Sequence, residues 1–301
     1  NGVVETAKAI NIPNDQRLLL VEPQEFVIDG HEVKEPIGMS GGRLEVKVHI
    51  VTGAQSAAEN ILKCVRRCGL EVDQLVLNPS ASSHAVLTED EKTLGVALVD
   101  IGAGTTDIAI FTDGAIRHTA VIPIAGDLIT SDIAMALRTP TKDAESIKIE
   151  FGVAKQLLAD PAGQLEVPGL GDRPPRMLSR QALAGVIEPR VEEIYSLVHQ
   201  VIRESGCEEL LSSGIVICGG SAVMPGMVEL GEDIFLKPVR RGNPTYSGAL
   251  HDMVANPRSA TVMGLLEEAR LGRSHGLRAS QQAGSVKTLV RRIKDWFLGN
   301  F

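Results

Sequence analysis

Residues 95–111 read GVALVDIGAGTTDIAIF, and this stretch decides the fold class. A short apolar run, Val96–Val99, ends at Asp100, and a turn rich in glycine and threonine separates it from a second apolar run. Because short apolar runs bounded by glycine are typical of buried strands, we predict a strand, a tight turn and a second strand. The Asp-Gly pair at 113–114 predicts a further hairpin into a strand over Ala115–Val121.

The turn has the composition of a phosphate-binding loop. Gly102 and Gly104 allow a ligand to approach the backbone N–H groups closely. The hydroxyls of Thr105 and Thr106 add donors, and Asp100 at the strand end is suited to hold a hydrated Mg²⁺. A glycine-rich turn between strands is more often only a turn, so this stretch alone leaves both interpretations open.

A second glycine turn follows another short apolar strand, Gly214–Cys218. Gly219, Gly220 and Ser221 come directly after it, and Pro225 then opens a predicted helix over Gly226–Phe235. Bare backbone between a strand and a helix is a second place where a nucleotide could bind. The alternative is a junction that needs small residues for packing.

The two turns, DIGAGTTD and ICGGSA, resemble the second phosphate loop and the adenosine loop of the actin, sugar-kinase and heat-shock-70 ATPase superfamily. This resemblance implies ATP with Mg²⁺ as the ligand. It further implies that Glu145 and Lys148, within AESIK, contact the adenosine; three residues apart, they share a helix face. The alternative for this pair is an ordinary surface ion pair. The superfamily's first phosphate loop, of the DxGT type, has no counterpart here, so we expect an N-terminally incomplete chain that binds ATP weakly.

Composition indicates a folded acidic protein. The 301 residues suffice for two lobes with their own cores, and 44% are hydrophobic. The net charge of −8 argues against a nucleic-acid partner. The four cysteines have no metal-site spacing and are expected to be reduced structural thiols in the cytosol. The sequence shows neither a signal-peptide pattern nor an apolar run long enough to span a bilayer.

Hydrophobic periodicity predicts the remaining elements. We predict strands over Leu18–Val21, Glu25–Ile28, Leu44–Val51 and Gln74–Leu77. We predict helices over Ala54–Cys68, Ala81–Leu87 and Asp127–Leu137, and a long helix from Leu183 to Val201 that contains Pro189.

The last residues, 285–301, are predicted to form an amphipathic helix that follows a flexible linker over 268–284. Its apolar stripe consists of Val286, Leu289, Val290, Ile293, Trp296 and Phe297. Arg291 and Arg292 lie on the opposite, basic face. Such a stripe is usually a packed core helix, but a basic helix with a Trp-Phe pair beyond a linker favours an interfacial membrane anchor that binds anionic lipid.

Together these features resemble the bacterial cell-division FtsA family over essentially the whole chain. The resemblance includes PQEFVIDG, VKEPIGMSG, RCGLEVDQLV, GDRPPR, VIEPR and the terminal helix. It implies an α/β, actin-like (ribonuclease H-like) two-lobe fold with an inserted small subdomain and a C-terminal amphipathic helix. The implied parts are a remnant of the inserted subdomain (1–50), the rest of the first lobe (51–93), the second lobe (94–138 and 206–267), its helical insert (139–205), the linker and the tail helix.

The family resemblance also implies a function. It is that of an ATP-binding adaptor, with at most slow hydrolysis, that tethers the FtsZ ring to the cytoplasmic face of the inner membrane at the septum. The implied partners are the FtsZ C-terminal tail, copies of the chain in filaments or minirings, and later division proteins. Arg176, Arg180 and Arg190 in the insert are candidates for binding the acidic tail, although they could equally be solvated surface arginines. The alternative function is a soluble actin-fold ATPase or a sugar kinase-like phosphotransferase.

Overall fold

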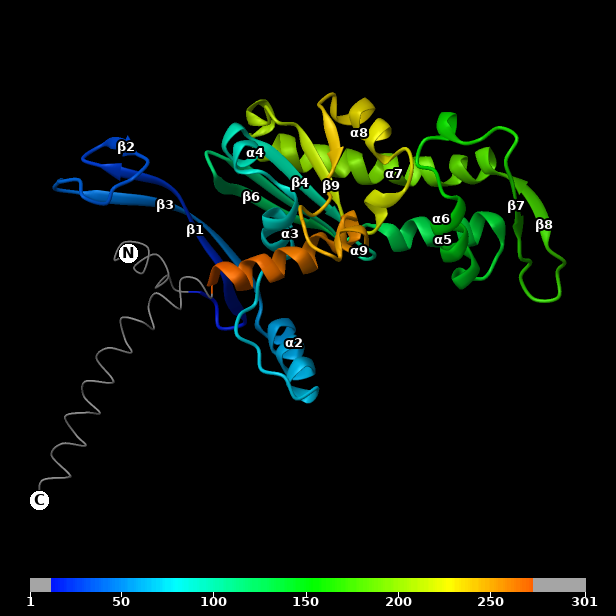
Figure 1. Cartoon of the computed structure of the whole chain (residues 1–301), viewed down its shortest axis with the longest axis horizontal. Helices are drawn as coiled ribbons and strands as arrows, with labels where there is room; N and C mark the ends of the chain where they lie inside the picture. The colour runs from blue at the N-terminus through cyan, green and yellow to red at the C-terminus, as the bar shows by residue number, and fades with distance from the viewer. Residues whose placement is uncertain (1–11, 273–301) are drawn as a thin grey trace, which may run out of the picture.

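The computed structural model describes residues 12–272, which are built around a five-stranded sheet (Figure 1). The strand order is β10-β9-β4-β5-β6. The strands are β4 (Val96–Ile101), β5 (Thr106–Thr112), β6 (Ala115–Ile122), β9 (Ile215–Cys218) and β10 (Val239–Arg241). Strands β4, β9 and β10 are parallel, whereas β4, β5 and β6 form an antiparallel meander. The predicted strand, turn, strand and hairpin are confirmed, and so is the α/β class.

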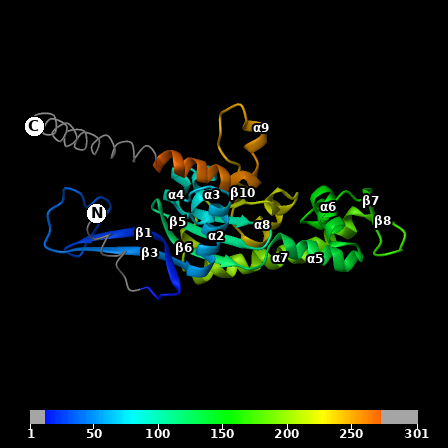
Figure 2. The same cartoon turned by 90° about the horizontal axis from the view of Figure 1, so that it is seen from below.

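Helices cover both faces of this sheet (Figure 2). Alternate residues of β4 point to opposite faces: Ala97, Val99 and Ile101 belong to one core cluster and Val96 and Leu98 to another. The first cluster includes residues of α5 (Gly126–Leu137), α7 (Arg180–Glu204) and α8 (Met227–Phe235). The second includes residues of α3 (Asn78–Val86) and of the helical residues 260–272. Because every residue of β4 is buried, its sequence is a continuous apolar run up to Asp100.

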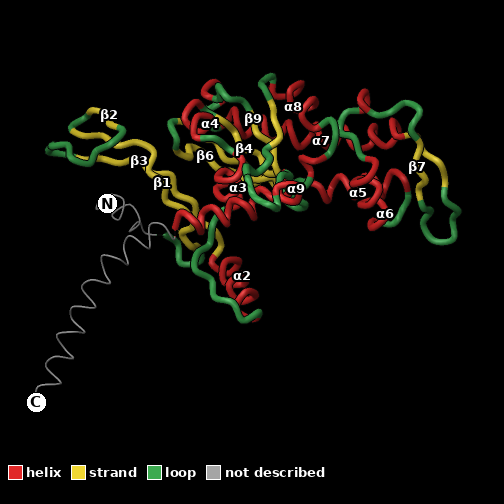
Figure 3. The backbone as a smooth tube through the Cα atoms, in the orientation of Figure 1, coloured by secondary structure: helices red, strands yellow, loops and turns green. Residues whose placement is uncertain are grey.

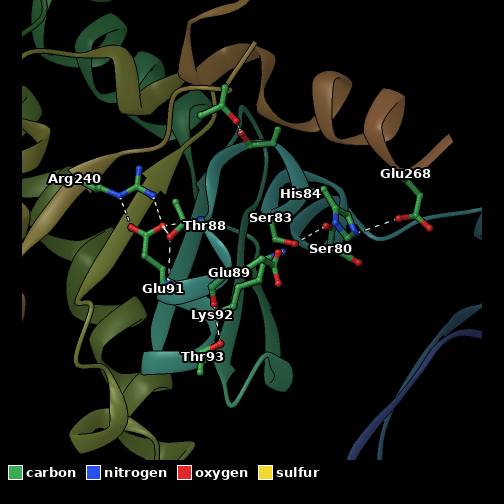
Figure 4. Close-up of polar contacts among 12 residues, drawn as sticks. Ser80, Ser83, His84, Thr88, Glu89, Glu91, Lys92, Thr93, Arg240 and Glu268 are labelled. Atoms are coloured by element: carbon green, nitrogen blue, oxygen red, sulfur yellow. Dashed lines mark hydrogen bonds and ion pairs between the residues drawn. The ribbon is translucent and has the colours of Figure 1, made fainter. Parts of the chain in front are cut away.

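A short helix, α4 (Glu89–Leu94), joins α3 to β4 and is fixed at both ends. Thr88 and Glu91 form a capping box at its N-terminus. The carboxylate of Glu91 also accepts two hydrogen bonds from Arg240 of β10, at 2.7 Å each (Figure 4). A third bond, from Arg240 Nη2 to the carbonyl of Val86, is also 2.7 Å long. Arg240 therefore attaches the segment that leads into β4 to the far edge of the sheet.

The first described segment forms a long hairpin that extends away from the central sheet (Figure 3). Strand β1 (Gln16–Ile28) pairs antiparallel with β2 (His31–Val33) and β3 (Leu44–Ala54), and α2 (Gln55–Arg67) follows. The register of β1 with β3 shifts at two places, one of them next to Pro23. Since proline has no N–H to donate, an irregular point in the ladder is where a strand accommodates it.

Polar contacts attach this hairpin to the edge strand β6. Gln24 Nε2 donates to the carbonyls of Ile116 and Arg117 at 3.0 and 3.1 Å. The Arg117 guanidinium forms an ion pair with Glu25 at 2.7 Å. The two hydrogen bonds of Gln24 join residues that lie 92 and 93 positions apart in the sequence.

The helical insert lies at the opposite end of the molecule from the hairpin (Figure 1). It contains α6 (Thr141–Phe151), the 3₁₀ turn η1 (Gln156–Leu158), and the antiparallel pair β7 (Gln164–Val167) and β8 (Arg176–Ser179), before α7 returns to the sheet. Pro189 lies inside α7, which continues without a break over 25 residues. The other short elements are η2 (Glu208–Leu210), η3 (Ser221–Val223), α9 (His251–Val254) and η4 (Pro257–Ser259).

Several predicted boundaries are wrong. Leu18–Val21 and Glu25–Ile28 belong to one strand, and residues 74–77 form no strand. Helix α3 begins at Asn78 rather than Ala81, and α8 begins at Met227 with Gly226 as its N-cap. Helical residues 260–272 overlap the first five positions of the predicted linker.

Within residues 12–272 no helix is both long and apolar enough to cross a bilayer. All four cysteines are free: Cys64 and Cys68 are exposed, Cys207 is half-buried and Cys218 is buried.

Candidate functional site

The first glycine turn lies against the N-terminus of α5. The N–H of Gly102 donates to the carbonyl of Thr105 at 3.0 Å, which closes the turn. The Gly102 carbonyl accepts from the N–H of Gly126 at 3.1 Å, and the Ala103 carbonyl accepts from the N–H of Asp127 at 2.8 Å. The Gly102 N–H is thus engaged within the protein, whereas a Cβ placed at Gly104 would meet no atom within 4 Å. Gly104 is the open position of the turn.

The two threonines of the turn differ in availability. Thr105 is exposed, and its hydroxyl lies 3.2 Å from Asp107. Thr106 is fully buried and donates its hydroxyl to the carbonyl of Ile124 at 2.7 Å. Since a hydroxyl has a single proton to donate, Thr106 has no donor left for a phosphate. The hydrogen bond of Thr106 helps to fix the turn, and its contact with a phosphate stays a prediction.

Asp100 is only 7% exposed and lies beneath the two turns. Its carboxylate accepts hydrogen bonds from Ser82 of α3 at 2.8 Å and from Thr261 at 3.2 Å. Antiparallel pairing places Asp107 directly opposite Asp100. Burial, together with the charge of Asp100, raises the pKa of Asp107. Two adjacent carboxylates have the oxygen chemistry that Mg²⁺ prefers.

The second glycine turn contacts the first. Gly219 has φ +89, and a Cβ there would lie 2.5 Å from both Asp100 Oδ1 and the Ile101 carbonyl, so only glycine fits. Gly220 faces open space, and the Ser221 hydroxyl donates to the Gly102 carbonyl at 3.2 Å. The sequence separates the two turns widely, and the parallel pairing of β4 with β9 brings them together.

Glu145 and Lys148 of α6 form an ion pair of 2.7 Å that is tied to α5. Lys148 Nζ donates to the Gly126 carbonyl at 3.0 Å and to the Thr130 hydroxyl at 2.8 Å. The Lys148 side chain is 10% exposed and that of Glu145 is 43% exposed. Burial acts to raise the pKa of Glu145, but hydrogen bonds from Lys148 and Thr130 outweigh it and hold that pKa below its usual value. The pair is therefore built into the fold and is more than a surface ion pair.

A pocket of about 520 Å³ opens between α6 and the two turns. Five residues predicted to bind the nucleotide line it: Gly102, Glu145, Lys148, Gly220 and Ser221. Gly126, at the start of α5, also lines it. Sequence reasoning missed Asp127, Ile149, Glu150, Val223, Met224 and two arginines, Arg180 and Arg258. Asp100, Gly104, Thr105, Thr106 and Gly219 are not among its lining residues. The wall thus combines apolar side chains, three cations, three carboxylates (Asp127, Glu145 and Glu150) and backbone at a strand–helix junction.

The three arginines of the insert do not share partners. Arg176 Nη2 donates to the Leu137 carbonyl at 2.7 Å. Arg180 lines the pocket. Arg190 forms an ion pair of 2.5 Å with Asp132 and a second one with Glu193.

Residues of the predicted membrane helix, 285–301, and the start of the chain lie outside the described residues. Among residues 12–272, no group of three or more His, Cys, Asp or Glu side chains is arranged to hold a metal ion.

Comparison with known proteins identifies the family. The family model for the cell division protein FtsA matches residues 97–264, and that for the SHS2 domain inserted in FtsA matches residues 1–52. The cell division protein FtsA of Pseudomonas aeruginosa is 55% identical over 99% of this chain and 73% of the relative. The chain belongs to the FtsA family. FtsA of Escherichia coli K12 is 43% identical over 100% of this chain and 74% of the relative.

Solved structures show that this FtsA-family chain has an actin-like fold. MreB5 of Spiroplasma citri bound to ADP superposes with a TM-score of 0.58 at 20% identity, covering 71% of this chain and 64% of MreB5. PilM in the PilM–PilN type IV pilus biogenesis complex gives a TM-score of 0.59 at 17% identity, covering 87% and 70%. The predicted family and fold are confirmed, and the family makes this a cell division protein.

Proposed function

We propose that this chain binds ATP with Mg²⁺ in the pocket between α6 and the two glycine turns. The observation that carries the proposal is the convergence of both turns and the Glu145–Lys148 pair on one pocket of about 520 Å³. In this arrangement the backbone around Gly104 lies near the phosphates, and the Glu145 carboxylate accepts from a ribose hydroxyl. Structures of Spiroplasma citri MreB5 bound to ADP and to AMPPNP support a nucleotide as the ligand.

Magnesium would be held through water by Asp100 and Asp107. The two residues are paired across β4 and β5 at the start of the turn, and burial together with the charge of Asp100 raises the pKa of Asp107, so a bound cation would favour its ionised form. The bound ion would supply charge neutralisation for the phosphates. We infer that the chain hydrolyses ATP slowly at most. Nucleotide binding then serves to control the association of copies of the chain more than to support a catalysed reaction.

The test of the nucleotide site is Gly104→Val in the full chain. A Cβ at Gly104 meets no atom of the protein, so the variant is expected to fold normally while the branched side chain blocks approach of the phosphates. ATP affinity, measured by isothermal titration calorimetry, is expected to fall by about tenfold or more, the equivalent of one charge-assisted hydrogen bond. Gly42→Val is the matched control, because Gly42 lies in the distant hairpin with only an ordinary contact at 3.5 Å. Equal ATP affinity of the two variants would refute the phosphate assignment.

We further propose that the chain is the adaptor between FtsZ and the membrane. The FtsZ C-terminal tail would bind the helical insert at Arg176, Arg180 and Arg190, and copies of the chain would associate into filaments or minirings that recruit later division proteins. The filament described for MamK, which gives a TM-score of 0.52, supports self-association on this fold. Of the three arginines, Arg176 is the most exposed and is the strongest candidate for a peptide carboxylate.

The membrane contact is proposed to be peripheral, on the cytoplasmic face of the inner membrane at the septum. Its carrier is the amphipathic segment 285–301, with an apolar stripe that includes Ile293 and Trp296. Membership of a cell-division family favours this function over a sugar kinase-like phosphotransferase.

A further inference from the structure

Arg180 has an unusual environment for a side chain on a pocket wall. It is the first residue of α7, and its backbone N–H donates to the Gly163 carbonyl at 2.9 Å. Its guanidinium forms one long hydrogen bond, from Nη2 to the Phe151 carbonyl at 3.4 Å, and its carbon lies 5.9 Å from the centre of the Phe151 ring. Its Nε atom is buried without a hydrogen-bond partner. Among residues 12–272 no carboxylate pairs with Arg180, so most of its donors are unused.

The place of Arg180 along the pocket indicates which part of a ligand it faces. Lys148 lies beside Gly126, which is bonded to the first glycine turn at Gly102. Arg180 is bonded to Phe151, almost one helical turn further along α6. A nucleotide with phosphates at the turn and ribose at Glu145 and Lys148 therefore directs its base toward Arg180.

The apolar part of the pocket lining suits a flat heterocycle. It includes Ile149 of α6 together with Val223 and Met224. Apolar walls exclude water from a base without fixing its orientation, which polar groups at the edge must do. A guanidinium offers only donors, in a planar fork, and the ring nitrogens of a purine are acceptors.

We propose that Arg180 is a specificity-determining residue that donates hydrogen bonds to ring nitrogens at the edge of the adenine base. This inference rests on the proposed nucleotide function and deepens it. The ligand supplies acceptors for the Nη atoms, which make only one long hydrogen bond, of 3.4 Å, within the protein. Because a ligand that excludes water without accepting from these donors leaves them unpaired, the site discriminates against such ligands.

The experiment compares ATP with ribose 5-triphosphate, which lacks the base, on the full chain and on Arg180→Met. The variant is expected to bind ATP about tenfold more weakly, as for the loss of a hydrogen bond from a charged donor, and to bind ribose 5-triphosphate with unchanged affinity. ATP analogues in which N1 or N7 is replaced by carbon are expected to bind the unaltered chain more weakly at the contacted position only. Arg173→Met is the matched control, because Arg173 is exposed and does not line the pocket.

Arg180→Lys tests whether ATP binding depends on directed hydrogen bonds from Arg180 or only on its positive charge. It also controls for the loss of side-chain packing on Phe151 in Arg180→Met. Lysine keeps the charge but lacks the planar fork, so ATP affinity is expected to fall toward that of Arg180→Met while the melting temperature is retained. If Arg180→Met weakens both ligands equally, or weakens neither, the inference is refuted while the proposed function stands. If the unaltered full chain binds no ATP, the proposed function fails first and the inference fails with it.

Discussion

Replacing Arg240 by methionine tests how strongly the sheet edge holds the segment that leads into β4 (Figure 4). The change removes two hydrogen bonds of 2.7 Å to the Glu91 carboxylate and one of 2.7 Å to the Val86 carbonyl. It leaves the Glu91 carboxylate bonded to the Thr88 N–H at 2.8 Å, so the capping box of α4 survives. Apart from a bond of 3.1 Å from Arg240 Nη1 to the Arg241 carbonyl, the perturbation is therefore confined to the links that β10 makes with Glu91 of α4 and Val86 of α3.

The magnitude follows from geometry and exposure. A hydrogen bond to a charged group contributes about 1.5–3 kcal/mol when it is well shielded. The Arg240 side chain is 42% exposed and that of Glu91 is 19% exposed, so solvent screening reduces the gain. We expect Arg240→Met to lower the free energy of unfolding by about 1–2 kcal/mol, with a coupling of about 1 kcal/mol between Arg240 and Glu91.

The assay is a double-mutant cycle of Arg240→Met, Glu91→Gln and their combination, measured by urea denaturation. Burial acts to raise the pKa of Glu91, but Arg240 and Thr88 outweigh it, so that pKa is lowered in the folded state. Stability from a lowered carboxylate pKa is present above the unfolded value of about 4.3 and is lost as pH falls through the folded value. The coupling is therefore expected to be full near pH 7 and to fade in acid. A coupling near zero at pH 7, or one that grows in acid, would refute the reasoning.

Three further predictions concern the other parts of the chain. Gly219→Ala is expected to lower the unfolding free energy by about 2 kcal/mol or more, because at φ +89 its Cβ would lie 2.5 Å from Asp100 and from the Ile101 carbonyl. The control Gly220→Ala, in open space, is expected to be near neutral, and equal urea midpoints of the two variants would contradict the prediction. Arg176→Glu is expected to weaken binding of an FtsZ tail peptide in fluorescence anisotropy, and an unchanged curve would move the docking site away from this arginine. Trp296→Glu is expected to abolish vesicle co-sedimentation through loss of about 2 kcal/mol of burial, while Trp296→Leu retains it; a lower melting temperature with unchanged vesicle binding would instead favour a packed core helix.

Local pattern predicted the elements whose partners are close in sequence. The meander from β4 to β6 is predictable because each connection is a short turn with glycine or threonine, and α7 because its apolar residues recur at helical spacing. Leu75, Val76 and Leu77 read as a strand but form none, since a strand needs a pairing neighbour that periodicity does not reveal. The two strands predicted over Leu18–Val21 and Glu25–Ile28 are one strand, because the ladder accommodates Pro23 at an irregular point between them.

Site residues that belong to a recognisable motif were predicted from the sequence. Those that only the topology of the fold brings to the site were missed. Gly219 and Lys148 stand in recognisable patterns, and both lie at or beside the pocket. Asp107 was not singled out from the sequence, and only the strand register places it opposite Asp100. Arg180 was predicted only as a candidate for binding the FtsZ tail, and the sequence did not reveal that the start of α7 packs beside Phe151 at the pocket. Side-chain direction at a helix start depends on tertiary packing that the sequence pattern does not encode.

The hydrogen bonds to Asp100 have a consequence for how the molecule opens. Its Oδ2 atom accepts from Ser82 and from Thr261, and these two hydroxyls lie 3.0 Å apart although 179 positions separate them in the chain. The chain between them is thereby closed into a ring that includes all five strands of the central sheet. Amide protons of α3 and of residues 260–272 are then expected to exchange with solvent as one cooperative unit, because neither helix separates from β4 without breaking the same three-way junction.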